Sequence, residues 1–150
     1  MNGLQQARAL ALAIPAGLLA GAYIAQYGFG LFPCEMCWWQ RWPHFAATGL
    51  AMLAFFMAPQ RVWTALAGLA IITSGLIGGF HAGVEYGWWQ GITGCATLPS
   101  AIDVMDVSAA PLVRCDVAPW SLFGISLAGW NFLISGIGGA AIVALAAYRK

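Results

Sequence analysis

The sequence predicts an all-α membrane protein: a bundle of four transmembrane helices with two extracytoplasmic loops that carry cysteines. Hydrophobic residues make up 61% of the 150-residue chain and charged residues only 7%, whereas about 25% of a soluble domain is charged. Long stretches without a charged residue alternate with short polar segments, and all four cysteines fall in those segments. The composition excludes a disordered chain. A net charge of +1 leaves no basic surface for nucleic acid.

Four uncharged stretches set the predicted helices. They contain 26, 19, 23 and 32 residues in chain order, and about 20 residues cross the hydrocarbon core as a helix. The helices are expected near residues 9–30, 42–59, 62–84 and 120–147, with outer loops near 31–41 and 85–119, in one domain of residues 1–150. Pro119 suits the first turn of the fourth helix. The first apolar run is longer than the core of a signal peptide, so a retained helix is expected there.

The basic residues predict the orientation. With four spans, both termini lie on one side, and that side carries Arg8, Arg61, Arg149 and Lys150 but no acidic residue. The opposite side carries two arginines and all five acidic residues. Lysine and arginine near span ends favour the cytoplasmic side. The termini are therefore expected in the cytoplasm and the cysteine-bearing loops outside it.

Glycines at four-residue spacing form ridges on two of the predicted helices. The third helix has Gly75, Gly79 and Gly83, and the first has Gly17 and Gly21. Small residues let helix backbones approach closely in lipid. Both ridges are therefore expected to pack against neighbouring helices.

The cysteines indicate thiol chemistry on the outer side, where disulfides form and persist. Cys34 and Cys37 form a CxxC pair directly before the second helix, and a helix N-terminus lowers the pKa of a thiol. Arg41 follows Cys37 by four residues, so on a helix its charge favours a Cys37 thiolate. A redox-active pair is the leading interpretation; a passive staple or half of a metal site stays open. Cys95 and Cys115 in the second loop form either a structural disulfide or a second exchange pair.

Both histidines of the chain are candidate site residues. His44 lies three residues after Arg41 and seven after Cys37, on the same helical face. His81 lies near the outer end of the third helix, with Glu85 one turn later. Ionisable groups at membrane depth are functional candidates by default. The alternative for each is an interface residue that is hydrogen-bonded to a loop.

Several motifs resemble the DsbB family of bacterial membrane disulfide-forming oxidoreductases, most closely its alphaproteobacterial members. They are Pro33-Cys34-Glu35-Met36-Cys37, Gln40-Arg41-Trp42-Pro43-His44, His81-Ala82-Gly83-Val84-Glu85, Cys115-Asp116 through Pro119-Trp120, and Gly124-Ile125-Ser126-Leu127-Ala128-Gly129-Trp130-Asn131. The resemblance covers nearly the whole chain, and paired cysteines in both outer loops of a four-span protein are specific. One departure is Leu127, where some members have a methionine.

The resemblance implies a function and roles. Cys95 and Cys115 would accept electrons from a periplasmic DsbA-type thiol oxidase and pass them to Cys34 and Cys37. A quinone from the membrane pool, with ubiquinone the expected species, would re-oxidise that pair with Cys37 nearest the ring. Arg41, His81 and His44 are the candidate quinone-binding residues, and no metal is expected. The protein would lie in the bacterial inner membrane.

Two alternatives remain at this point. The first is a metal-handling membrane protein that uses the CxxC pair and a histidine. It predicts bound metal and reduced thiols in the purified protein. The second is a family paralogue dedicated to one substrate oxidase, which nothing in the sequence separates from the general enzyme.

Overall fold

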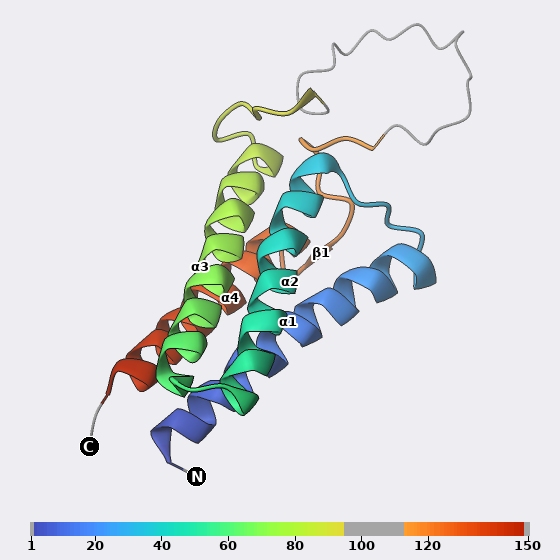
Figure 1. The fold of residues 1–150 in the computed structure, drawn as a ribbon. Helices are drawn as coiled ribbons and strands as arrows, with labels where there is room; N and C mark the ends of the chain where they lie inside the picture. Colours follow the sequence, from blue (N-terminus) through green and yellow to red (C-terminus); the bar gives the residue numbers. More distant parts are fainter. Residues whose placement is uncertain (1, 95–112, 149–150) are drawn as a thin grey trace, which may run out of the picture.

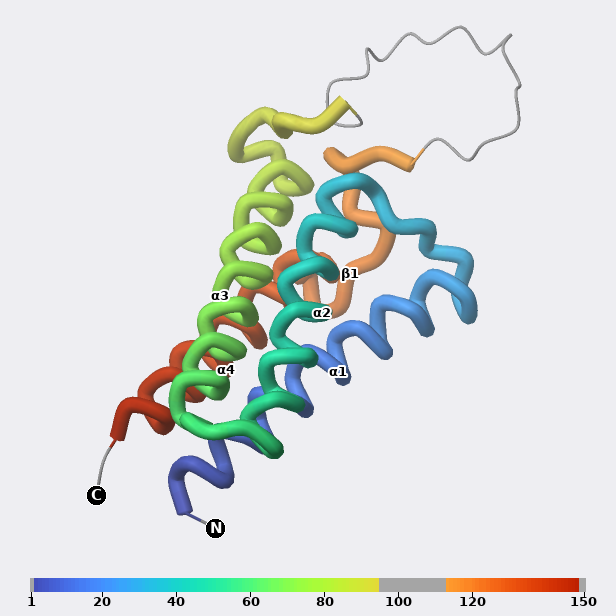
Figure 2. The backbone as a smooth tube through the Cα atoms, in the orientation of Figure 1, coloured from blue at the N-terminus to red at the C-terminus, as the bar shows by residue number. Residues whose placement is uncertain are grey.

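The computed structural model describes residues 2–94 and 113–148. Within these residues the chain is a bundle of four helices with one short hairpin (Figures 1 and 2). The helices are α1 (Gly3–Gly28), α2 (Glu35–Phe56), α3 (Gln60–Glu85) and α4 (Leu127–Ala147), and the strands are β1 (Ser121–Leu122) and β2 (Ile125–Ser126). The two ends of the chain lie at the same end of the bundle. The N-terminus of α2 and the segment that begins at residue 113 lie at the other.

Helices α1 and α2 begin earlier than the uncharged stretches predicted, because side chains cap them. Asn2 and Gln5 form a reciprocal capping box, so α1 begins at Gly3 and not near residue 9. Cys34 is the N-cap of α2, where its sulfur accepts a hydrogen bond from the Cys37 backbone N–H. Glu35 in the first turn is favourable there, since an acidic group complements the positive helix end. The CxxC pair therefore opens the second helix and does not precede it, and residues 35–41 are not loop.

Helix α4 begins later than expected, at Leu127 and not near residue 120. Residues 121–126 form the antiparallel β1–β2 pair. Its turn has Phe123 and Gly124 at φ values of 53° and 77°, which a helix cannot contain. Pro119 consequently precedes the hairpin and is not in the first turn of α4. Ser126 is the N-cap, and its hydroxyl accepts from the Gly129 N–H.

The half of the bundle near the termini is closely packed around small side chains. Its buried cluster contains Ala11, Ala47, Ala51, Ala67, Ile71 and Ile142. Glycines bring α3 and α4 together: a Cβ on Gly139 would lie 2.9 Å from the Gly68 carbonyl oxygen, and one on Gly75 would lie 3.1 Å from the Gly136 nitrogen. Gly75 and Gly79 of the predicted ridge thus pack against α4 as expected, whereas Gly83 packs against Trp89, which follows the helix. Helix α1 diverges from α2 towards the cysteine end (Figures 1 and 2).

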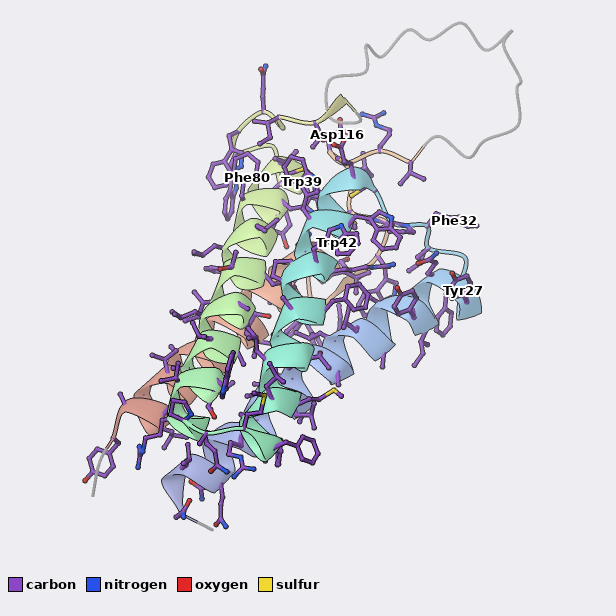
Figure 3. All side chains as sticks on the ribbon, viewed as in Figure 1. Tyr27, Phe32, Trp39, Trp42, Phe80 and Asp116 are labelled. Atoms are coloured by element: carbon purple, nitrogen blue, oxygen red, sulfur yellow. The ribbon has the colours of Figure 1, made fainter. Side chains whose placement is uncertain are left out.

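Three helices of the described chain are long and apolar enough to span a membrane. They are α1, α3 and α4, with mean hydropathies of 1.6, 1.7 and 1.7. Helix α2 falls outside this group, since its first half carries Glu35, Gln40, Arg41 and His44. Figure 3 shows Trp39 and Phe80 near Asp116 at the cysteine end, while Tyr27 and Phe32 lie on the diverging part of α1 and the loop after it.

Candidate thiol and cavity site

The N-terminus of α2 presents two free thiols to each other. Cys34 and Cys37 are not bonded, and their sulfur atoms lie 2.9 Å apart. Cys34 is 5% exposed. Its sulfur also accepts from the Cys37 backbone N–H at 3.3 Å, so both partners of the pair are held by the first turn of the helix.

The two thiols have opposite pKa shifts. The Cys37 thiol donates to the Cys34 sulfur and lowers the pKa of Cys34 to about 5; burial opposes this shift and His81 assists it. The pKa of Cys37 is raised, first because Cys34 holds its proton and second because it is buried. The expectation of a thiolate on Cys37 is therefore wrong, and the stabilised thiolate is on Cys34. Arg41 does not reverse this order, because it donates its hydrogen bonds to Gln26 and to the Ala22 carbonyl.

His81 contacts three groups with one ring nitrogen. Its Nε2 lies 3.7 Å from the Cys34 sulfur, 3.2 Å from the Cys115 carbonyl oxygen and 3.7 Å from a Glu85 oxygen. A carbonyl oxygen only accepts, so Nε2 carries the hydrogen. The other nitrogen, Nδ1, lies 2.9 Å from Gln40 Nε2, which also donates to the Met36 carbonyl. Gln40 thus holds His81 in the tautomer whose N–H points to Cys34 and Cys115.

Cys115 lies beside the first pair. It is fully buried in one apolar cluster with Cys34, Met36 and Val84, and Cys37 packs against this cluster. Cys115 is disulfide-bonded. Cys95, the other predicted member of the second pair, lies outside the described residues.

An apolar cavity of about 260 Å³ lies on the inner side of the pair. Its lining comes from all four helices and includes Cys37, Arg41, His44, His81 and Asn131. A cavity of about 150 Å³ holds benzene, so this one has room for a single substituted ring. Cys37 lines this cavity and also an outer pocket, which it shares with Cys34, Val113 and Arg114. The CxxC pair is therefore accessible both from the cavity, through Cys37, and from the side of the second-loop segment.

The glycine ridge of α1 borders this cavity. A Cβ on Gly17 or Gly21 would meet no atom within 4 Å, and both residues line the cavity. The prediction that this ridge packs against a neighbouring helix is therefore wrong. The missing side chains leave the space open where α1 diverges from α2.

Arg41 is a buried cation in the cavity wall. It is 6% exposed and donates to the Gln26 side-chain oxygen at 2.7 Å and to the Ala22 carbonyl at 3.3 Å. Its guanidinium lies 5.0 Å from the ring centroids of Tyr23 and of Trp38. Within the described residues no carboxylate lies at salt-bridge distance from it. The charge is thus held in place by neutral acceptors and rings, which leaves it free to attract an electron-rich ligand atom.

A chain of buried amides connects the two histidines. Gln40 Oε1 accepts from Asn131 Nδ2 at 2.9 Å, and Asn131 Oδ1 lies 3.0 Å from His44 Nε2. Gln40 and Asn131 lie in motifs of the sequence but were not predicted to have a role, and Gln26 was not predicted as a site residue. The available signal was an uncharged amide in an apolar helix, since such groups are retained where they find buried partners.

The same residues offer a set of ligand atoms for a metal. The two CxxC sulfurs and a His81 ring nitrogen lie within 4.8 Å of one another. Two thiolates and an imidazole suit a thiophilic cation such as zinc. The arrangement therefore has two chemical uses, disulfide exchange and metal binding.

Comparison with known proteins shows which proteins this chain is similar to. The model of the DsbB family, described as disulfide bond formation protein DsbB, matches residues 5–146. A disulfide bond formation protein B of Verminephrobacter eiseniae is 32% identical over 152 residues, covering 92% of this chain and 82% of the relative. One from Marinobacter nauticus is 29% identical, covering 81% and 79%. An uncharacterized protein of Rickettsia prowazekii is 25% identical, covering 78% and 73%. No solved structure gives a significant match.

Proposed function

We propose a function for this chain on one established premise: it belongs to the DsbB family of disulfide bond formation proteins. The chain is a protein-disulfide:quinone oxidoreductase that re-oxidises a periplasmic DsbA-type thiol oxidase. Electrons pass from that partner to Cys95 and Cys115, then to Cys34 and Cys37, and then to a membrane quinone, with ubiquinone the expected species. The relatives, which are named disulfide bond formation protein B, support disulfide formation, and the proposed order of steps rests on the geometry of this chain.

One observation carries the proposal: the CxxC pair adjoins both the second-loop cysteine and the cavity. Cys34 shares a buried cluster with Cys115, and Cys37 lines the cavity. A thiol exchange partner and an electron acceptor can therefore reach opposite members of one pair. The lowered pKa of Cys34 supports its part in exchange, because the thiolate is the reactive form and the better leaving group.

The chemistry requires an acceptor stronger than the soluble partner, whose potential in this family is near −120 mV. Because Cys34 is ionised, oxidation of the pair to a disulfide releases two electrons and the Cys37 proton, and a quinone that takes up these together with one proton from water becomes a quinol. The residues of the chain bind and orient this ligand. The Arg41 guanidinium supplies N–H donors for a carbonyl oxygen, the apolar walls exclude water, and the His81 N–H stabilises charge on the Cys34 sulfur.

The proposed location is the bacterial inner membrane, with four spans, cytoplasmic termini and the cysteine end in the periplasm. The three apolar helices support membrane insertion. Helix α2 would form the fourth span from about residue 42 onward, with its CxxC turn at the interface. The excess of basic residues on the side of the termini supports the orientation.

The decisive experiment uses the purified protein, a reduced DsbA-type partner and ubiquinone-1. We expect quinone reduction in proportion to partner oxidation, and none with Cys37→Ser. Cys115→Ser should accumulate a mixed disulfide between the partner and Cys95. A trapped complex on Cys34 would contradict the proposed order, and turnover without quinone would contradict the acceptor.

A second candidate function, metal handling, is supported by the three clustered ligand atoms. It predicts a stoichiometric thiophilic metal in the protein purified without chelator. It also predicts that the metal protects both CxxC thiols from alkylation. A disulfide between Cys34 and Cys37 in the isolated protein, with no bound metal, would exclude it.

A further inference from the structure

His44 carries a buried ring nitrogen whose hydrogen-bonding capacity is unused. The residue is 3% exposed and lines the cavity. Its Nδ1 is buried and has no hydrogen-bond partner within the described residues. Such groups are rare in folded proteins, because a buried polar atom without a hydrogen-bond partner is costly. An orphaned atom in a cavity wall indicates that a ligand supplies the partner.

The surrounding network fixes what that nitrogen can do. Asn131 Nδ2 lies 3.1 Å from the Ser74 carbonyl oxygen, which only accepts, so the amide nitrogen faces Ser74. Asn131 Oδ1 then faces His44 Nε2 at 3.0 Å and also accepts from the Ser135 hydroxyl at 2.8 Å. An amide oxygen cannot donate, so His44 Nε2 carries the hydrogen. In the neutral ring Nδ1 is therefore a bare acceptor.

Two features keep the ring neutral. Arg41 lies one helical turn away on α2 and lines the same cavity as a buried cation. A second positive charge on His44 would be buried beside this cation, which is costly, and Glu85, the carboxylate in the same cavity wall, is paired with His81 at 3.7 Å. The cavity wall thus presents donors from Arg41 and an acceptor from His44, and these recognise different forms of one ligand.

We propose that His44 selects the reduced, hydroxyl-bearing form of the cavity ligand, a hydroquinone, by accepting a hydrogen bond from its O–H at Nδ1. This inference rests on the proposed function. A quinone has only carbonyl acceptors, which Arg41 can satisfy and His44 cannot. When the CxxC pair becomes a disulfide, its two electrons, the Cys37 proton and one proton from water convert the quinone to the quinol, and the new hydroxyl gains a partner.

The consequence is thermodynamic. Tighter binding of the quinol than of the quinone raises the reduction potential of the bound couple, and each tenfold preference corresponds to about 30 mV for two electrons. His44 would therefore make the bound quinone a stronger oxidant of Cys34 and Cys37. It acts on the driving force of the reaction, and its loss leaves thiol exchange with the soluble partner unchanged.

The first test needs no variant of His44. The chain has two histidines, so protein labelled with ¹⁵N-histidine gives two Nδ1 signals, and His81→Phe assigns them. Saturating ubiquinol-1 should shift the His44 Nδ1 resonance in the direction of an accepted hydrogen bond, and ubiquinone-1 should not. An unchanged His44 resonance on quinol saturation would overturn the inference.

The second test compares affinities. His44→Phe keeps the ring and removes both nitrogens, and it should weaken ubiquinol-1 binding about tenfold while ubiquinone-1 binding stays within twofold. Thr48→Val, one turn further along α2 and outside the cavity lining, is the matched control and should change neither. If His44→Phe weakened the binding of ubiquinol-1 and ubiquinone-1 equally, His44 would only shape the cavity and the inference would be overturned. Failure of the wild type to bind either ligand would instead contradict the proposed function.

Discussion

The two halves of the bundle are built from the same four helices but from different kinds of side chain. The half near the termini is packed with alanine, isoleucine and glycine, and its helices approach to backbone contact at Gly68 and Gly139. The cysteine half buries a cation, two histidines and two amides around a cavity. Polar groups there are bonded to one another in a network, with only isolated atoms left over.

The difference indicates a division of labour along the helix axes. Close packing of small residues stabilises the half near the termini. At the other end α1 diverges from α2, and an apolar cavity with room for a ring lies next to Cys37 (Figures 1 and 2). Substitutions in the first half should therefore act mainly on stability, and substitutions in the second mainly on chemistry.

The largest expected effect is on the packed half. In Gly139→Leu, the added Cβ alone would lie 2.6 Å from Ile72 and 2.9 Å from the Gly68 carbonyl oxygen. Such overpacking costs about 3 kcal/mol, and thermal unfolding in detergent measures the loss. Gly49→Leu is the matched control, since its Cβ meets no atom within 4 Å. Equal stability of the two variants would show that the seam is not tightly packed.

The next effect is on Cys34 reactivity in the reduced protein. A thiol with an ordinary pKa near 8.5 is only a few per cent ionised at pH 7. Cys34, with its pKa lowered to about 5, should be almost fully ionised there, about 30-fold more. The rate of Cys34 alkylation by iodoacetamide, measured by peptide mass spectrometry, should fall as the pH is lowered, with a midpoint near pH 5. The stabilisation of the folded, reduced state by this thiolate is present above the ordinary thiol pKa and is lost as pH falls through about 5.

If iodoacetamide alkylated Cys37 faster than Cys34 at low pH, the assignment of the thiolate to Cys34 would be contradicted. Cys37→Ser is the informative variant, because it removes the thiol donor that contributes most to the lowered pKa of Cys34. The midpoint of Cys34 alkylation should then move to higher pH. His81→Phe should move it in the same direction but by less, because the contribution of His81 is smaller.

The contrast between the two halves also separates what the sequence predicts from what it does not. Uncharged length predicted four helices, because hydrocarbon thickness imposes that length. The start of α4 was missed, because a hairpin turn at Phe123 and Gly124 replaces its expected first residues. The glycines of α1 and α3 have the same spacing, yet one ridge packs and the other lines a cavity. Spacing reports a small-residue face but not the distance to the neighbouring helix.

The site shows the same limit. All the described candidate residues, Cys34, Cys37, Arg41, His44, His81 and Cys115, lie at the cysteine end and contact either the CxxC pair or the cavity. Their roles depend on tertiary partners that spacing does not encode. The thiolate lies on Cys34 because Cys37 and His81 donate to it. The histidine tautomers depend on Gln40 and Asn131, which are 91 residues apart in sequence.

A smaller effect is expected for the open ridge. Gly17→Leu places a side chain in the cavity without meeting an atom at its Cβ. Quinone affinity should fall about tenfold because ring volume is lost, while the free energy of unfolding stays within about 1 kcal/mol, the helix-propensity gain over glycine. Equilibrium binding of ubiquinone-1 measures the first quantity and thermal unfolding the second. Gly49→Leu again serves as control. If Gly17→Leu lost as much stability as Gly139→Leu, the proposed difference between the two halves would be wrong.

The smallest effect, and the most specific, concerns Arg41. Arginine near a helix end commonly extends its charge to the lipid headgroups, and lysine replaces it in that role. The Arg41 side chain is instead 6% exposed, with its nitrogens directed to Gln26 and Ala22 and its plane near two aromatic rings. A planar donor with fixed direction is not reproduced by the ammonium of lysine. Arg41→Lys should therefore raise the KM for quinone about threefold to tenfold and leave the KM for the soluble partner unchanged, because that partner reacts at the second-loop cysteines. Steady-state kinetics with each substrate varied in turn separates the two constants. If both KM values stayed at the wild-type level, Arg41 would be a membrane anchor. If only the KM for the soluble partner rose, Arg41 would act on thiol exchange with that partner and not on quinone binding.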